Sequence, residues 1–154
     1  MKISKLFKVA IASLILAVGV NAAEEMTPDL AHAKKMGMKP VSLEEEKKRY
    51  DQKVIFVDTR TKMKFAEGHI KGAIFSDYIH GKDNKKVDGD LALDKYDLTD
   101  LPKDKSTKIV FYCQGAGCWK SFSYARAAEK AGYKNSYWFR DGLPGWQKAG
   151  YPVK

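Results

Sequence analysis

Cysteine and histidine are scarce in this chain of 154 residues, which contains two of the first and three of the second. Two cysteines are too few for a small domain stapled by several disulfides, so the fold must depend on a hydrophobic core. Cys113 and Cys118 lack the second pair of ligands that a zinc site needs, and the histidines are scattered along the chain. Trp119 follows Cys118, whereas haem attachment requires a histidine there. We therefore expect no metal ion and no other cofactor.

The chain also lacks an apolar run long enough to span a bilayer. The apolar stretch at residues 9–20 falls well short of the roughly 20 residues that a span requires. Three lysines and no acid precede this stretch, and the small residues of NAAEE follow it. That order is typical of a secretory signal peptide. We expect residues 1–22 to be removed, the mature chain to begin near Ala23, and the protein to be periplasmic or secreted without a stable membrane span. An uncleaved N-terminal anchor is the alternative.

Arginine is rare among the basic residues, so lysine supplies most of the formal net charge of +9. The lysines are interspersed with acids, as in LEEEKKRYDQK, which is typical of a solvated surface. The sequence shows no basic stripe with interleaved aromatic residues, so no nucleic-acid partner is predicted. A positive field of this kind mildly favours small anionic substrates.

Strand-like and helix-like segments alternate along the rest of the chain. Strand-forming runs occupy residues 53–60, 73–79, 108–113 and 136–139, and helical patterns occupy residues 27–37, 40–50, 62–69, 120–133 and 143–150. Thr27 is a candidate helix cap, and Ser42 and Glu45 have the spacing of a capping box. Residues 80–106 are polar and loop-like, with a helical turn as an option at 93–104. The alternation predicts an α/β fold with a largely parallel sheet.

The most informative stretch is the loop that holds both cysteines. Cys113 stands where the strand-like run ends, and in open α/β sheets ligands gather at the carboxyl ends of strands. Gly115 and Gly117 permit backbone conformations that turn several N–H groups toward one point, and the start of the next helix adds its positive dipole end. A thiol above such a cradle is acidified, which makes Cys113 a candidate nucleophile. A buried structural cysteine or a plain local disulfide is the open alternative.

Four segments, in this order, resemble the signatures of the rhodanese-like domain family. They are a strand ending in Asp58-Thr59-Arg60 followed by EGHIKGA at residues 67–73, the strand KIVFYC with Cys113 in the position of the catalytic cysteine, the helix-like KSFSYARAAEKAGY, and FRDGLPGWQKAGYPV at the C-terminal end. The resemblance covers roughly residues 40–153. It implies a domain at 40–154 after an N-terminal extension at 23–39. It also implies about five mainly parallel strands flanked by helices on both faces.

The resemblance further implies sulfurtransferase chemistry at Cys113. The Cys113 thiolate would attack the outer sulfur of thiosulfate or a similar small anionic donor, release sulfite and remain as a persulfide. Cyanide, a thiol or a protein acceptor would then take the sulfur. The implied substrate-binding residues of the loop are Gln114, Gly115, Ala116, Gly117, Trp119, Lys120 and Ser121. Asp58 and Arg60 are supporting residues, and a structural ion pair is their simpler interpretation.

The loop departs from the family pattern in length. Lys120 and Ser121 match a basic residue and a hydroxyl that usually follow the cysteine more closely, so this loop is about two residues longer. The extra length surrounds Cys118 and Trp119, a pair that resembles a subset of exported rhodanese-like proteins. Cys118 is a candidate resolving or regulatory residue. Asp141 also replaces a glycine of the C-terminal signature.

Several functions therefore compete. The leading hypothesis is a sulfurtransferase that uses Cys113. The second is a thiol–disulfide or persulfide-handling redox protein that uses the Cys113/Cys118 pair, and the third is a non-catalytic binding module on the same scaffold. A phosphatase-like role is weaker, because it would normally require arginine at the position of Lys120. His69 is expected to cap a turn and Trp146 to lie in the core.

Overall fold

The computed structural model describes residues 28–85 and 88–154. The expected signal peptide at 1–22 and the expected cap at Thr27 lie outside the described residues. Within the described part of the chain, no helix has the length and apolar character needed to cross a membrane. The helices are α1 (Pro28–Lys35), α2 (Leu43–Asp51), α3 (Lys62–Glu67), α4 (Lys120–Lys130) and α5 (Gly142–Lys148), with short 3-10 turns η1 (Leu91–Leu93) and η2 (Leu98–Asp100).

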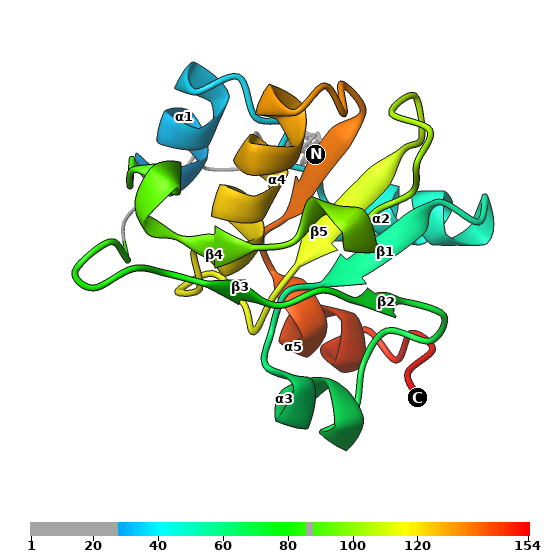
Figure 1. Cartoon of the computed structure of the whole chain (residues 1–154). Coiled ribbons are helices and arrows are strands. Elements are labelled where there is room, and N and C mark those ends of the chain that lie inside the picture. Colours follow the sequence, from blue (N-terminus) through cyan, green and yellow to red (C-terminus); the bar gives the residue numbers. More distant parts are fainter. Residues whose placement is uncertain (1–27, 86–87) are drawn as a thin grey trace, which may run out of the picture.

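The centre of the molecule is a parallel sheet of four strands in the order β2-β1-β5-β6 (Figure 1). These strands are β1 (Ile55–Asp58), β2 (Ile74–Phe75), β5 (Ile109–Tyr112) and β6 (Ser136–Phe139). All three pairings within the sheet are parallel, so the strand ends at Asp58, Tyr112 and Phe139 lie in register at one edge. The predicted α/β fold with a mainly parallel sheet is confirmed, with four strands in the main sheet instead of about five.

The segment predicted as one strand at 73–79 forms two. Strand β2 ends at Phe75, and β3 (Tyr78–Ile79) pairs with β4 (Lys95–Tyr96) in a separate antiparallel ribbon. The two polar residues between them explain the break. The Ser76 hydroxyl is 2.8 Å from an Asp100 carboxylate oxygen and 2.7 Å from the Tyr124 hydroxyl, so its partners lie in other parts of the chain and not in the strand itself.

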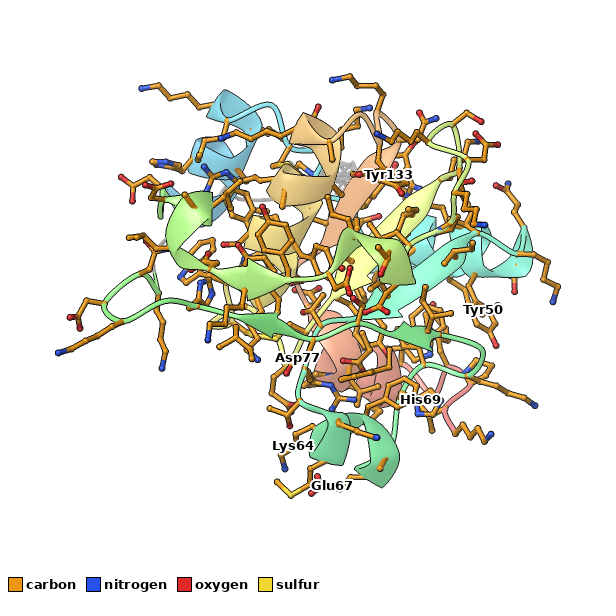
Figure 2. The ribbon with its side chains drawn as sticks, in the orientation of Figure 1. Tyr50, Lys64, Glu67, His69, Asp77 and Tyr133 are labelled. Carbon is orange, nitrogen blue, oxygen red and sulfur yellow. A yellow bond between two sulfur atoms is a disulfide. The ribbon has the colours of Figure 1, made fainter. Side chains whose placement is uncertain are left out.

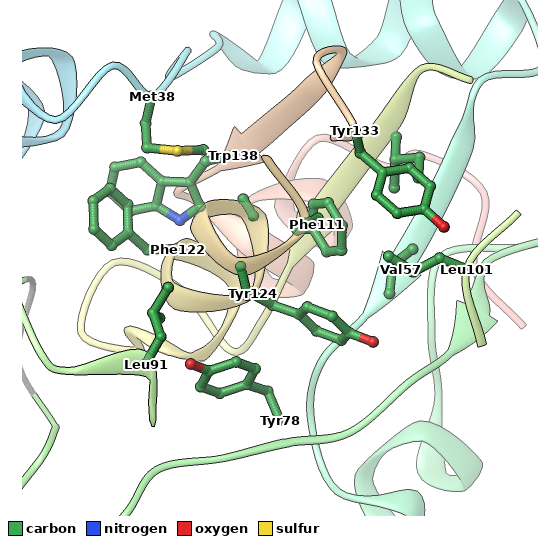
Figure 3. Packing of buried hydrophobic residues seen from close by; sticks show 14 of the residues in the cluster. Met38, Val57, Tyr78, Leu91, Leu101, Phe111, Phe122, Tyr124, Tyr133 and Trp138 are labelled. Carbon is green, nitrogen blue, oxygen red and sulfur yellow. The ribbon is translucent and has the colours of Figure 1, made fainter. Parts of the chain in front are cut away.

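Helices cover both faces of the sheet. We call the apolar cluster under α1 and α4 the α4-side core, which includes Val57, Ile109, Phe111, Phe122, Tyr124 and Trp138 (Figure 3). We call the cluster under α2 and α5 the α5-side core, which consists of Phe56, Ile70, Val110, Tyr112, Phe139, Leu143 and Trp146. Trp146 is fully buried, as predicted for a core residue. Strand β5 is buried along its whole length, since successive side chains alternate between the two cores.

Local capping chemistry fixes the ends of the helices. The Ser42 hydroxyl accepts from the Glu45 N–H while the Glu45 carboxylate accepts from the Ser42 N–H, so the predicted capping box of α2 is present. Helix α3 ends before Gly68, also as predicted. His69 Nδ1 lies 2.9 Å from the Phe65 carbonyl oxygen and its ring stacks on Phe65, which agrees with the expected capping role (His69 is labelled in Figure 2).

Candidate active site

Cys113 follows β5 directly and is 2% exposed. Strand alternation sets the direction of its side chain. Phe111 belongs to the α4-side core and Tyr112 to the α5-side core, so the next residue, Cys113, points back toward α4. The sulfur of the candidate nucleophile therefore lies on the side of the sheet where the following helix begins.

The loop after Cys113 turns back on itself and closes a disulfide. Gly115 has φ of +125°, a conformation that favours glycine, and its carbonyl oxygen accepts from the Cys118 N–H at 2.9 Å. This turn carries Cys118 to Cys113, with a Cα–Cα distance of 6.3 Å and a bond between the two sulfurs. In this state Cys113 has no free thiolate, so it cannot act as a nucleophile until the disulfide opens.

The first turn of α5 also contacts Cys113, through the carbonyl oxygen of that residue. The Leu143 N–H donates to the Cys113 carbonyl oxygen at 3.0 Å. Gly142 has φ of +57°, and a Cβ atom placed there would lie 2.3 Å from that carbonyl oxygen. Glycine is therefore required where α5 approaches the loop. Sequence reasoning found Gly142 only as part of a family signature and did not find this contact.

Asp58 and Arg60 form a buried ion pair at 2.7 Å, as the simpler interpretation of these residues predicts. The Arg60 Nη1 group also donates to the Gln114 side-chain oxygen at 3.3 Å, which ties the end of β1 to the cysteine loop. Burial, followed by the nearby Asp58 carboxylate, raises the pKa of Tyr112, so its hydroxyl stays neutral. That hydroxyl accepts from the Ile70 N–H at 3.1 Å. Within this cluster, the hydrogen bond from Arg60 to Gln114 connects the buried ion pair to the cysteine loop.

Lys120 is the basic side chain nearest in sequence to the two cysteines, and it is already paired. Its Nζ atom lies 3.1 Å from the Asp77 carboxylate, and both side chains are partly exposed (Asp77 is labelled in Figure 2). Asp77 stands between β2 and β3, in the polar break that divides the predicted strand. Sequence reasoning missed Asp77, because its partner is 43 positions away.

The remaining predicted loop residues divide into three groups. Gln114, Gly115 and Ala116 line an open groove of about 710 Å³ beside α5, whose other walls are Leu43, Asp141, Pro144, Gly145, Lys148 and Ala149. Neither cysteine lines this groove. Trp119 instead packs against Phe122 and Trp138, and Ser121 is 1% exposed on the inner face of α4. Gly117 is exposed at the tip of the loop.

A second, smaller hollow of about 190 Å³ also has Gln114 in its wall. Arg60, Lys64, Glu67, Gly68, Leu143 and Gln147 complete its walls. Gln114 thus lines two depressions, and the smaller one is rich in charged groups. In the described part of the chain, no group of three His, Cys, Asp or Glu side chains could hold a metal ion.

The comparison with protein families matches residues 40–149 to the rhodanese-like domain model. The chain therefore belongs to the rhodanese-like domain family. A comparison with curated proteins finds no match.

Solved structures of related folds agree with this assignment. The BH2092 protein from Bacillus halodurans aligns at 21% identity over 80% of this chain and 82% of its own, with a TM-score of 0.57. A thiosulfate sulfurtransferase from Pseudomonas aeruginosa aligns at 19% identity over 82% of this chain and 22% of its own, with a TM-score of 0.55. RPA3614 from Rhodopseudomonas palustris, described as a possible tyrosine phosphatase, aligns at 17% identity over 82% of this chain and 93% of its own, with a TM-score of 0.56. At these identities the similarity defines the fold alone.

Proposed function

We propose that the protein is a sulfurtransferase that carries sulfane sulfur on Cys113. The observation that supports this most directly is the position of Cys113 at the carboxyl end of the central strand β5, between the glycine loop and the first turn of α5. The family assignment supports the proposal, because Cys113 lies within the matched residues and the resemblance of its strand to the family signature implies that it is the catalytic cysteine, although the family also hosts other functions.

The proposed reaction has two steps. The Cys113 thiolate attacks the outer sulfur of thiosulfate or a similar anion, the bond between the two sulfur atoms of the donor breaks, and sulfite leaves with the bonding electron pair. A thiophilic acceptor then attacks the outer sulfur of the Cys113 persulfide and restores the thiolate. Loop N–H groups and the positive end of α4 would stabilise the negative charge on the persulfide.

The disulfide adds a condition to this reaction. Because Cys113 is bonded to Cys118, the protein must be reduced before it can accept sulfur. We also infer an exported location, where disulfides persist, from the expected signal peptide at residues 1–22. This location predicts a mature chain that begins near Ala23. N-terminal sequencing of the protein from a periplasmic fraction tests that prediction.

A thiocyanate assay tests the transfer. The protein is reduced, freed of reductant and incubated with thiosulfate and cyanide. We expect thiocyanate from the reduced wild type, much less from the oxidised wild type, and none from Cys113→Ser. Cys118→Ser, which cannot form the disulfide, is the matched variant and should form thiocyanate without prior reduction. Inactivity of both the reduced wild type and Cys118→Ser with thiosulfate and with other sulfane donors would refute the proposal.

A second candidate is thiol–disulfide exchange that involves no sulfane sulfur. The Cys113–Cys118 disulfide is the observation that favours it, because a reversible disulfide in one short loop is sufficient for this chemistry. The same samples distinguish the two functions. An exchange protein would oxidise a dithiol peptide in a cysteine-dependent manner while forming no thiocyanate from any donor.

A further inference from the structure

The loop places a second thiol within bonding distance of the proposed sulfur carrier. The turn from Gly115 to Cys118 brings the two cysteine side chains together, and the Cys113 carbonyl at the end of β5 is bonded to the first turn of α5. Their Cα–Cα distance of 6.3 Å lies within the usual range for a disulfide. Cys118 can therefore reach the Cys113 sulfur without a rearrangement of the sheet or helices.

We propose that Cys118 resolves the Cys113 persulfide within the same chain, releasing hydrosulfide and closing the Cys113–Cys118 disulfide. This inference rests on the proposed sulfurtransferase function and gives that function a particular outcome. In the absence of a competing acceptor, the protein converts the outer sulfur of its donor to sulfide. The disulfide in the structure is then the product of one turnover.

The step balances in atoms and electrons. The Cys118 thiolate attacks the inner sulfur of the persulfide, which is the Sγ atom of Cys113. The bond between the two cysteine sulfurs forms, the bond between Cys113 Sγ and the outer sulfur breaks, and the outer sulfur leaves as hydrosulfide with the bonding pair. The two cysteine sulfurs are oxidised by two electrons in total, and the sulfane sulfur is reduced by two.

Burial favours this internal attack over an external one. Cys113 is 2% exposed, whereas Cys118 is partly exposed, and neither lines the large groove beside α5. An acceptor from solution must therefore approach a sulfur carried by a residue that is buried in the disulfide state, while the Cys118 thiolate starts from the same loop and has a high effective concentration. Helix α4 begins two residues after Cys118, and its positive end favours the thiolate form of that residue.

The same difference in exposure indicates how the disulfide opens. A thiolate from solution has access to Cys118 and little access to Cys113, so it attacks the Cys118 sulfur and Cys113 leaves as the free thiolate. The second thiol of a dithiol reductant then attacks the mixed disulfide and frees Cys118. Over the whole cycle, thiosulfate and a dithiol are converted to sulfite, sulfide and the disulfide of the reductant. The partner that this cycle requires is a dithiol reductant.

A single-turnover experiment tests the resolution step. Full-length protein is reduced, freed of reductant under anaerobic conditions and mixed with thiosulfate without an acceptor; sulfite, sulfide and remaining thiols are then measured. The wild type is expected to release one sulfite and one sulfide per chain and to lose both thiols. Cys118→Ser is expected to release sulfite, to keep a persulfide on Cys113 and to release sulfide only at background level. A sample without thiosulfate measures disulfide formation by residual oxidant.

Each result has one meaning. Sulfite release with a retained persulfide in the wild type would overturn the inference while leaving the sulfurtransferase function intact, as would equal sulfide release from Cys118→Ser. Absence of sulfite in both proteins counts against the proposed function. In that case the reduced chains are loaded with inorganic polysulfide, so that the resolution step can be tested separately. After this loading, wild-type sulfide release with disulfide closure still supports the inference, and a stable wild-type persulfide contradicts it. Circular dichroism confirms that both proteins are folded.

Discussion

Opening the disulfide should have a small effect on stability, because it closes a short loop. The two cysteines are separated by five positions, and the loop-closure relation gives about 2 kcal/mol of stabilisation for a loop of this length. The two cores on either side of the sheet, and not this bond, hold the domain together. We therefore expect the reduced protein to stay folded and cooperative.

Urea unfolding measures this contribution. Cys118→Ser is the informative variant, because Cys118 is partly exposed and its replacement leaves no buried cavity, whereas serine at Cys113 would bury a hydroxyl. The expected decrease in the free energy of unfolding is about 2 kcal/mol, both for Cys118→Ser and for the wild type in the presence of a reductant. Agreement between the two samples would assign the change to the bond itself.

A much larger loss would refute this reasoning. If reduction lowered the free energy of unfolding by about 5 kcal/mol or unfolded the domain, the disulfide would be a structural staple of the kind found in small secreted domains. A bond of that kind could not open in each catalytic cycle. The stability measurement thus separates a reactive disulfide from a structural one without an assay of activity.

Three further predictions concern residues around the site and the core. Burial raises the pKa of Glu46 from its ordinary 4.5 to about 8, so the folded state holds a proton that the unfolded chain releases. The free energy of unfolding should therefore fall by about 5 kcal/mol as pH rises from about 4.5 to 8, and Glu46→Gln should remove this pH dependence in urea titrations. Gly142→Ala would place a Cβ atom 2.3 Å from the Cys113 carbonyl oxygen, which should destabilise the domain by about 3 kcal/mol in urea unfolding and slow thiocyanate formation. Asp77→Asn removes the partner of Lys120 and should lower the KM for thiosulfate about two- to fivefold in steady-state assays, with less effect at high salt.

Two of these predictions have a matched control variant. Glu44→Gln changes an exposed carboxylate on the same helix and should leave the pH dependence of stability as it is. Gly150→Ala also introduces a side chain at positive φ, of +72°, but into open space, so it should cost only about 1 kcal/mol. An unchanged KM for thiosulfate in Asp77→Asn would show that Lys120 does not contact the donor.

Local sequence signals predicted the elements well. The capping box at Ser42 and Glu45, the helix stop at Gly68 and the buried strand at 108–113 depend on neighbours within four residues, so the pattern alone was sufficient. The break of the 73–79 segment depends on distant partners. Ser76 contacts Tyr124, 48 positions away, and no local pattern contains that information.

The site was predicted in part for the same reason. Cys113 was recognisable because strand, cysteine, glycines and helix are adjacent in sequence. The spacing of Cys113 and Cys118 permitted a disulfide but could not decide it, because closure depends on the turn at Gly115. The contact between Gly142 and the Cys113 carbonyl joins segments that are far apart in the chain, so it emerged only from the structure.

The central claim is that Cys113 carries sulfane sulfur, and peptide mass spectrometry after exposure to thiosulfate tests it most directly. The Cys118→Ser variant is incubated with thiosulfate, the excess donor is removed, and the peptide that contains Cys113 is fragmented. We predict one added sulfur atom on Cys113, lost on treatment with cyanide. An unmodified Cys113 after exposure to thiosulfate and to other sulfane donors would contradict the account.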